Sequence, residues 1–352
     1  MISKINIIYL LPEMKGAAGG AKVIYNHSFI LNRLSKKVES TVLHIKKKIA
    51  YKIELSLAKK IKKLNLRLDS GWDGTKMKVS NNYSPSKKWH DKNIKIFKSL
   101  QFNRNKEFVI LPEIFSHFAE DLNFKKRGIK YAIFVQGSHH TNSTNDYKKI
   151  KSSYENANII IVSSLDGHNF ISKIFPKCLG KIYKVNLSID FINKKVTKKN
   201  FITCMPRKLP AHFNLLKFYL KDKLPGNWSF DPLDNIDYTE LKNKINRSKI
   251  FLSFSHLEGL GLPPLEAAFA GNKVIGYDGG GGKEYWKKPI FHKINYGEIN
   301  QFGEILLTEI KNYNKSWIHK TKKQREYLLK KYSITSEEKS LKGLSKKISN
   351  FF

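Results

Sequence analysis

Two glutamates and a run of glycines make the stretch 253–286 the part of the chain best suited to chemistry. Glu258 and Glu266 are eight residues apart, and both follow an apolar run at 250–254 that is typical of a buried strand. Open α/β sheets bind ligands at the carboxyl ends of their strands, where both carboxylates are predicted to lie. Glycines let backbone amides approach a phosphate without interference from a Cβ atom. The stretch therefore predicts a site for a phosphorylated ligand.

The elements that position the two glutamates can be predicted from the same stretch. After the strand at 250–254, a loop carries Glu258, and the prolines at 263–264 suit the first turn of a helix, where a missing N–H costs nothing. Good helix formers follow, up to a C-cap at Gly271. A strand at 274–277 then runs into four consecutive glycines. The start of the helix would add a positive dipole end to the site.

The stretch resembles the donor-site signature of a family of sugar transferases. The string E-G-L-G-L-P-P-L-E-A-A-F-A-G-x-x-V-I begins at Glu258 and is followed by G-G-x-x-E. It is similar to the signature of the retaining GT-B glycosyltransferases often called GT4. The resemblance implies an α/β protein with the GT-B fold, in which two Rossmann-like, doubly wound parallel-sheet domains face a central cleft. Apolar runs alternate with helical segments twice along the chain, which also predicts two such sheets.

The resemblance also assigns roles to residues of the stretch. It implies that Glu266 accepts hydrogen bonds from ribose hydroxyls, and that Glu258 faces the transferred sugar and stabilises positive charge near its anomeric carbon. Sugar or phosphate oxygens would be held by the backbone at Gly259, Leu260, Gly261, Gly280 and Gly281. It implies no obligatory metal and no cofactor besides the donor substrate, and the chain has no Asp-x-Asp cluster. Taken singly, each glutamate also has a structural alternative: Glu258 would be an ordinary loop glutamate, and Glu266 a glutamate near a helix N-terminus, where the dipole favours a carboxylate.

A pair of cations follows a second predicted strand. Arg207 and Lys208 come after the apolar run 201–205. In the family that the chain resembles, a basic pair beyond this strand grips the donor diphosphate, and cations there would offset charge on the leaving nucleotide. The commoner spacing puts an arginine and a lysine about five residues apart, whereas here they are adjacent and His212 stands where the lysine would be. The alternative is a surface turn.

The beginning of the chain has the order of strand, glycine-rich loop and helix. An apolar run at 5–11 predicts the strand, and a helix is predicted at 21–34. Between them, Gly19 and Gly20 would lie near the donor diphosphate and the acceptor if the resemblance holds, with Lys22 nearby. A glycine loop after a first strand is common in any Rossmann-like domain, so this loop alone is a weak signal.

The strand predicted at 131–135 ends in a polar loop. Related glycosyltransferases often place a histidine at this strand end, close to the transferred sugar. Here Gln136 occupies roughly that place, and His139 and His140 follow a few residues later. The contact with the sugar is therefore open between Gln136 and His139, and the alternative is a solvated or capping pair of histidines.

The remaining pattern predicts three segments. Residues 1–190 would form an N-terminal acceptor-side domain, 191–335 a C-terminal donor-binding domain, and 336–352 a helix that returns to the first domain. A lysine-rich stretch at 193–200 would be the linker. Further strands are predicted at 38–45, 108–111, 159–162 and 182–187, helices at 214–221, 239–248, 300–313 and 319–332, and an irregular region at 225–237.

The chain is strongly basic. Its 352 residues carry 65 Lys and Arg against 29 Asp and Glu, a formal net charge of +36. Such a charge attracts nucleotide diphosphates, nucleic acid or an anionic membrane surface, and a compositional lysine bias is the alternative. A basic amphipathic helix is predicted at 53–68, which would dock on anionic lipid or pack on its own sheet. Without a signal peptide or an 18-residue apolar run, we expect a cytoplasmic protein, peripheral to the inner face of a membrane.

These observations lead to one expected function and two alternatives. We expect transfer of a sugar from a nucleotide sugar to a glycan or lipid-linked acceptor, with retention of anomeric configuration, in bacterial surface polysaccharide biosynthesis. The first alternative is a GT-B protein that binds a nucleotide sugar without transferring it, or a GT-B epimerase or phosphorylase. The second is a nucleic-acid-binding protein, but no such binding signature is present and no nucleic-acid partner is expected. The two cysteines, Cys178 and Cys204, match no zinc or redox spacing.

Overall fold

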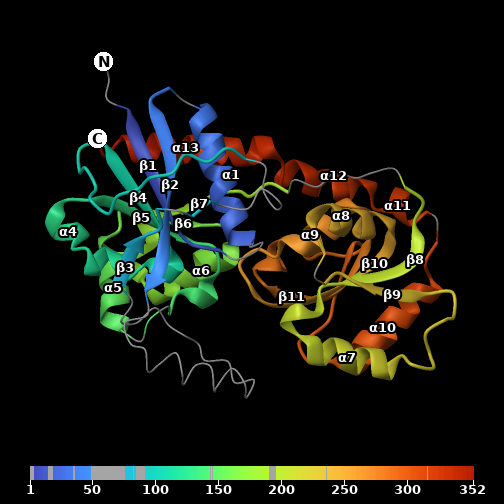
Figure 1. The fold of residues 1–352 in the computed structure, drawn as a ribbon. Helices are drawn as coiled ribbons and strands as arrows, with labels where there is room; N and C mark the ends of the chain where they lie inside the picture. The colour runs from blue at the N-terminus through green and yellow to red at the C-terminus, as the bar shows by residue number, and fades with distance from the viewer. Residues whose placement is uncertain are drawn as a thin grey trace. The chain divides into compact units, whose positions relative to one another are not determined.

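The chain divides into two units, each built on its own β-sheet, in a computed structural model (Figure 1). The structure describes residues 4–14, 19–34, 36–48, 76–81, 83–84, 92–142, 144, 146–189, 196–234, 236–314 and 316–352. The first unit comprises Met1–Val162, His168–Val185 and Glu338–Phe352. The second comprises Ser163–Gly167 and Asn186–Glu337.

The first unit is built on a seven-stranded sheet with the strand order β3-β2-β1-β4-β5-β6-β7. Its strands are β1 (Ile5–Pro12), β2 (Val38–Lys48), β3 (Lys76–Val79), β4 (Glu107–Pro112), β5 (Lys130–Val135), β6 (Ile159–Val162) and β7 (Ile182–Lys184). All neighbours run parallel except β2 and β3. Every residue of β4 and β6 is buried, as their apolar runs require of strands covered on both faces. The order reverses between β1 and β4, so a topological switch point lies at their carboxyl ends.

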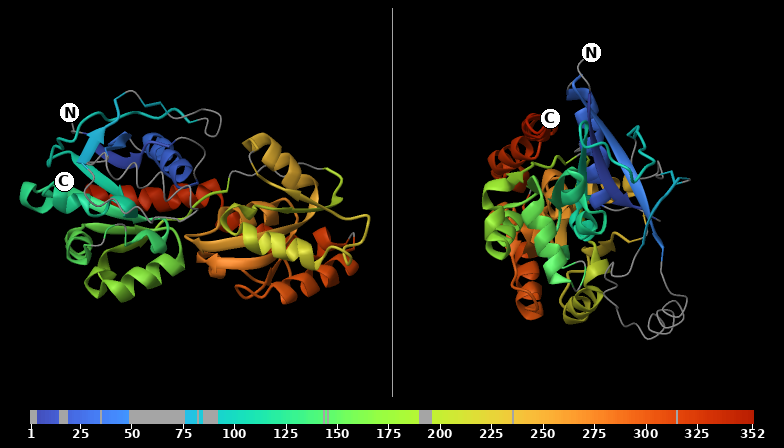
Figure 2. Two further views of the ribbon diagram at one scale, coloured as in Figure 1. Left: turned by 60° about the horizontal axis from the view of Figure 1, so that its bottom comes forward. Right: turned by 90° about the vertical axis from the view of Figure 1, so that its left-hand side faces the viewer.

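Helices cover this sheet, including one from the far end of the chain. They are α1 (Gly19–Leu34), α3 (Phe118–Asp121), α4 (Phe124–Arg127), α5 (Tyr147–Asn156), α6 (Leu165–Ile174), α13 (Ile334–Ser349) and the short 3₁₀ helices η1 (Glu113–Phe115), η2 (Ser138–His140) and η3 (Pro176–Lys181). The red C-terminal helix α13 runs beside the blue and green elements in Figures 1 and 2. Tyr183 Oη donates a hydrogen bond to Ser340 O at 2.9 Å, and the Phe351 ring stacks on Phe108. The end of the chain therefore completes the core of the first unit.

The second unit is built on a five-stranded parallel sheet with the order β12-β11-β10-β8-β9. Its strands are β8 (Lys199–Cys204), β9 (Ser229–Pro232), β10 (Ser248–Glu258), β11 (Lys273–Gly280) and β12 (Phe291–Lys293). Its helices are α7 (Pro210–Tyr219), α8 (Tyr238–Arg247), α9 (Leu262–Phe269), α10 (Ile299–Lys311), α11 (Trp317–Lys320), α12 (Lys322–Lys331), η4 (Pro206–Lys208) and η5 (Gly281–Glu284). After β8 the chain forms β9 at the edge of the sheet, and it then returns to form β10 on the opposite side of β8. A second switch point therefore lies where β8 and β10 end.

The structure confirms most of the predicted strands and corrects several details. Glu258 lies at the end of β10 and not in a loop, because β10 continues past the predicted 250–254 through a bulge after Ser255. The helix predicted at 239–248 begins at Tyr238 as α8, and Asp237 is its N-cap, since the Asp237 side chain accepts a hydrogen bond from Glu240 N at 2.8 Å. The region 225–237 contains β9, which pairs with β8 at the sheet edge.

Other differences concern where helices and strands begin and end. Helix α7 begins at Pro210, four residues before the predicted start, because proline is favoured in a first turn. The helix predicted at 319–332 is two helices that break at Thr321, whose hydroxyl donates to Trp317 O at 2.8 Å. The strand predicted at 182–187 ends at Lys184.

Some predictions fall outside the described residues. These are the basic helix at 53–68 and the domain boundary at 190–191 with the first part of the linker. The division at 190 and 335 stays a proposal. Within the ranges that the structure describes, no helix is long and apolar enough to cross a membrane.

Candidate functional site

The topological switch point of the second sheet brings the predicted cations and the first glutamate to one edge. Strands β8 and β10 pair in parallel, with Cys204 opposite Leu252, so their carboxyl ends lie side by side. The chain leaves β8 through η4, which carries Arg207 and Lys208. It leaves β10 at Glu258. The fold therefore places a basic turn and a carboxylate where α/β sheets bind ligands.

Lys208 and Glu258 form an ion pair at this edge. Lys208 Nζ lies 2.6 Å from Glu258 Oε1, and both side chains are partly exposed to solvent. An ion pair of this kind contributes little to stability, since water screens it and two long side chains must be ordered. Arg207 is exposed on the same turn. The pair is thus accessible, and it can reorganise when a charged ligand arrives.

The end of β10 packs closely against glycines at the end of β11 and the start of η5. A Cβ atom on Gly279 would lie 2.9 Å from Glu258 Cγ, and one on Gly281 would lie 1.8 Å from Gly259 O. Leu257, just before the glutamate, has a φ of 49°, a left-handed conformation that is rare and strained for leucine. The glycines at 279 and 281 are therefore needed for packing against the Glu258 turn, besides any role with phosphate.

Helix α9 begins four residues after Glu258 and carries Glu266, which is half-buried. Its first turn contains the two predicted prolines, and its N-cap residue, Gly261, has a φ of 79°. Tyr285 Oη donates to Gly261 O at 2.7 Å and lies 3.0 Å from where a Cβ of Gly261 would be. Burial raises the pKa of Tyr285 well above its ordinary value, so the phenol keeps the proton for this bond. The Tyr285 hydroxyl thus anchors the loop between Glu258 and Glu266 through Gly261.

Glu284, the last residue of the G-G-x-x-E string, is used by the fold itself. Its side chain is 2% exposed and accepts hydrogen bonds from Leu165 N at 2.8 Å and Tyr332 Oη at 3.0 Å, all within the second unit. Lys331 Nζ lies 3.2 Å from the same carboxylate. These contacts give this glutamate a structural role, which its place in the string did not reveal.

Four aromatic and imidazole rings form a cluster in the second unit that was not predicted from the sequence. The Tyr296 ring lies 5.1–5.3 Å from the rings of His212, His256 and Tyr277. A hydrogen bond of 3.0 Å joins His212 Nδ1 and Tyr277 Oη. His212, the residue at the position expected for lysine, therefore packs into this cluster. A histidine at the position where a lysine was expected was the only sign of this cluster in the sequence.

In the first unit, the structure brings Gly20 and Gln136 together. The Gln136 Oε1 atom lies 3.1 Å from where a Cβ of Gly20 would be, so the amide side chain rests on the start of α1. Gly19, one residue earlier, has open space around it. The His139 ring folds back over Gly137, 2.7 Å from its would-be Cβ, and lies 4.1 Å from the ring of His140. Gln136 thus lies at the start of α1, while His139 packs on its own turn.

Glu113 is a buried carboxylate below this turn, and the sequence analysis gave it no role. It directly follows β4 and is 4% exposed. Its Oε1 accepts a hydrogen bond from Gly137 N at 2.9 Å. Burial raises the pKa of Glu113 to about 7, although hydrogen bonds from backbone amides, including those of Gln136 and Gly137, oppose this shift.

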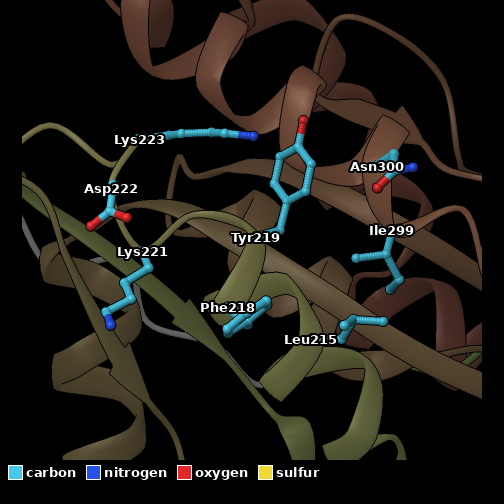
Figure 3. Close-up of a pocket in the computed structure, with 8 residues that line it drawn as sticks. All are labelled: Leu215, Phe218, Tyr219, Lys221, Asp222, Lys223, Ile299 and Asn300. Atoms are coloured by element: carbon cyan, nitrogen blue, oxygen red, sulfur yellow. The ribbon is translucent and has the colours of Figure 1, made fainter.

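A depression of about 550 Å³ lies elsewhere on the second unit, between α7 and α10. Figure 3 shows its lining, with Leu215 and Phe218 on one helix face and the Tyr219 ring at its centre. The Lys223 ammonium lies 3.7 Å from the centre of that ring. None of the predicted site residues lines this depression. In the part of the chain that the structure describes, no three His, Cys, Asp or Glu side chains are grouped to hold a metal ion.

Comparison with known proteins identifies the fold. The sequence matches no protein-family profile and no curated protein. Solved structures do match. They include S. aureus TarM in a complex that contains UDP (13% identity, 99% of each chain, TM-score 0.60) and Anabaena HepE in complex with UDP (10% identity, 97% of this chain and 100% of that one, TM-score 0.63). Sucrose-phosphate synthase from Thermosynechococcus elongatus matches 99% of this chain and 100% of its own, with 11% identity and a TM-score of 0.62. The chain therefore has the predicted GT-B fold.

Proposed function

We propose that the chain is a retaining glycosyltransferase of the GT4 type. It transfers a hexosyl group from a nucleotide-diphosphate sugar to a glycan or lipid-linked acceptor in bacterial surface polysaccharide biosynthesis. The observation that carries the proposal is the pairing of Lys208 with Glu258 at the switch point of the second sheet. A cation for a diphosphate and a carboxylate for a sugar are adjacent there. The UDP in the TarM and HepE complexes supports a nucleotide sugar as the ligand.

The cations act on the leaving diphosphate. Arg207 and Lys208 offset the negative charge that develops on it as the glycosidic bond breaks, which lowers the barrier. In the structure Lys208 pairs with Glu258. A diphosphate carries more charge than one carboxylate, so the donor draws Lys208 toward itself and frees Glu258 for the sugar. Donor binding and release of the catalytic carboxylate are thus coupled.

The carboxylates and the glycine-rich backbone orient the donor. Glu258 accepts hydrogen bonds from sugar hydroxyls and stabilises positive charge near the anomeric carbon, and Glu266 accepts from the ribose hydroxyls. The N-terminus of α9 adds its dipole near the phosphates. Amides and carbonyls of five residues hold the remaining oxygens: Gly259, Leu260, Gly261, Gly280 and Gly281.

The first unit supplies groups for the acceptor side of the reaction. Gly19 and Gly20 present amides at the start of α1, and Gln136 rests against them. Gln136 and His139 are the candidates for contact with the transferred sugar. Neither a metal nor another cofactor takes part, and we place the enzyme in the cytoplasm at an anionic membrane surface, to which its charge of +36 attracts it.

A panel of nucleotide sugars tests the proposal. We expect one donor to stabilise the protein saturably, to turn over with an acceptor, to give a product of retained anomeric configuration by NMR, and to do so in EDTA. If no nucleotide sugar binds, the transferase proposal is wrong.

One observation favours a second candidate, a GT-B protein that binds a nucleotide sugar without transferring it. Gln136, directly after β5, stands where related enzymes often carry a histidine, and an amide, unlike an imidazole, does not act as an acid or base near neutral pH. Donor binding without turnover against any acceptor would support this candidate.

A further inference from the structure

We propose that Glu113 is a positioning residue for the turn 136–140, and that its buried carboxylate holds Gln136 and His139 where the reaction needs them. What the turn contacts rests on the proposed function. Glu113 itself touches no substrate in this account.

Glu113 lies beneath the turn because of how the first sheet is built. Strands β4 and β5 pair in parallel with Pro112 opposite Phe134, so the residue after β4 meets the turn after β5. Glu113 Oε1 then accepts the Gly137 amide at 2.9 Å. Burying a carboxylate is costly unless hydrogen bonds compensate it, and an apolar side chain would fill the same space at less cost. The specific feature that glutamate adds is an acceptor for the backbone of this turn.

The turn held in this way carries both candidate contacts of the first unit. Gln136 precedes Gly137 and rests on Gly20 at the start of α1. The His139 ring packs on the α-carbon of Gly137 itself. A shift of Gly137 therefore displaces both side chains together. Glu113 Oε1 accepts the Gly137 amide and so fixes the position of Gly137 within the turn.

Hydrogen exchange tests the positioning directly and does not depend on activity. In Glu113→Ala, amides of residues 136–141 should exchange about 10-fold faster or more than in the wild type, because the hydrogen bond from Gly137 N to the Glu113 carboxyl is lost. Glu113→Gln keeps an acceptor and should remain within about 3-fold of the wild type. If the alanine variant does not fold, Glu113→Asp serves instead, since its shorter side chain should release the turn.

Glu107 provides the matched control at the other end of the same strand. It is also a buried glutamate, 8% exposed, and accepts a backbone hydrogen bond from Asn103 N at 2.6 Å. Glu107→Ala should lower stability but leave exchange at 136–141 unchanged. Unchanged exchange at 136–141 in both Glu113→Ala and Glu113→Asp would overturn the proposal, as would equal acceleration there in Glu107→Ala.

Kinetics then connect the turn to the reaction. With a donor that the wild type turns over, Glu113→Ala should lower kcat by about 10-fold or more with little change in the donor KM, because the donor is held by the second unit. Glu113→Gln should restore most of the rate. A loss of rate in Glu107→Ala as large as in Glu113→Ala would contradict a specific role. Absence of any turnover would count against the proposed function only, and the exchange result would still stand.

Discussion

Lys208 Nζ and Glu258 Oε1 lie 2.6 Å apart, although fifty residues separate them in the sequence. The contact exists because β8 and β10 are neighbours in the sheet, while the strand between them in sequence, β9, pairs on the far side of β8. A reversal of strand order thus brings together a cation and a carboxylate that the sequence analysis had treated separately.

Removal of this cation should affect turnover far more than stability. We expect Lys208→Met to lower kcat about 100-fold or more, because one electrostatic contact to the leaving group is lost. The free energy of unfolding should change by less than about 1 kcal/mol, since the pair is exposed to solvent. Steady-state kinetics and urea unfolding measure the two effects. Lys223→Met, which removes an exposed lysine at the α7–α10 depression, is the control and should leave both unchanged.

Gly281 should tolerate no side chain. A Cβ atom there would lie 1.8 Å from Gly259 O, so Gly281→Ala forces the backbone after Glu258 to move. We expect a loss of about 2 kcal/mol or more in unfolding free energy, together with weaker donor binding. Gly226→Ala in the same unit has no atom within 4 Å of the new Cβ and should be nearly neutral. Equal stability of the two variants would contradict the packing described for the glycine run.

The buried carboxyl of Glu113 should make stability depend on pH. Its pKa rises from 4.5 to about 7 on folding, because burial disfavours the charged form. The folded state therefore binds more protons between these values, and stability falls as pH rises through this window. Glu113→Gln does not titrate. The difference in unfolding free energy between this variant and the wild type should therefore shift by about 3 kcal/mol in favour of the variant from pH 4 to pH 8. Urea unfolding at both pH values checks this, and a constant difference would contradict it.

The basic charge predicts adsorption to anionic lipid. Vesicles containing phosphatidylglycerol should sediment the protein at low salt, and binding should weaken as salt screens the charges. Phosphatidylcholine vesicles are the control and should leave the protein in the supernatant. Equal binding to both kinds of vesicle would count against an electrostatic membrane partner.

The parts of the fold that the sequence predicted well are those with a local physical signal. The apolar run 159–162 coincides with β6, because only a strand buried on both faces tolerates such a run. The prolines at 263–264 marked the start of α9 for an equally local reason. By contrast, β9 has the sequence SFDP and is only partly buried, so it resembles a loop until its pairing with β8 is seen.

The residues of the candidate site also differ in whether a local sequence signal could reveal them. The glutamates and cations could be selected from their types and spacing, but their contacts depend on which strands are neighbours. Glu113 had no local signal at all, because its partner, Gly137, is 24 residues away and meets it only through the pairing of β4 with β5. The cluster around Tyr296 likewise joins residues from four separate elements or loops.

The proposed function requires the second unit to bind a nucleotide donor through Glu266 and the residues beside it. Isothermal titration of UDP, GDP and ADP into the wild type, Glu266→Ala and Glu240→Ala tests it most directly. Glu240 is a suitable control, because it is an exposed glutamate in the first turn of another helix of the same unit. We predict that one nucleotide binds the wild type and Glu240→Ala equally, and Glu266→Ala at least about 10-fold more weakly, as expected when a carboxylate that accepts ribose hydroxyls is lost. Binding of that nucleotide with unchanged affinity to Glu266→Ala, or no binding of any nucleotide to the wild type, would contradict the account.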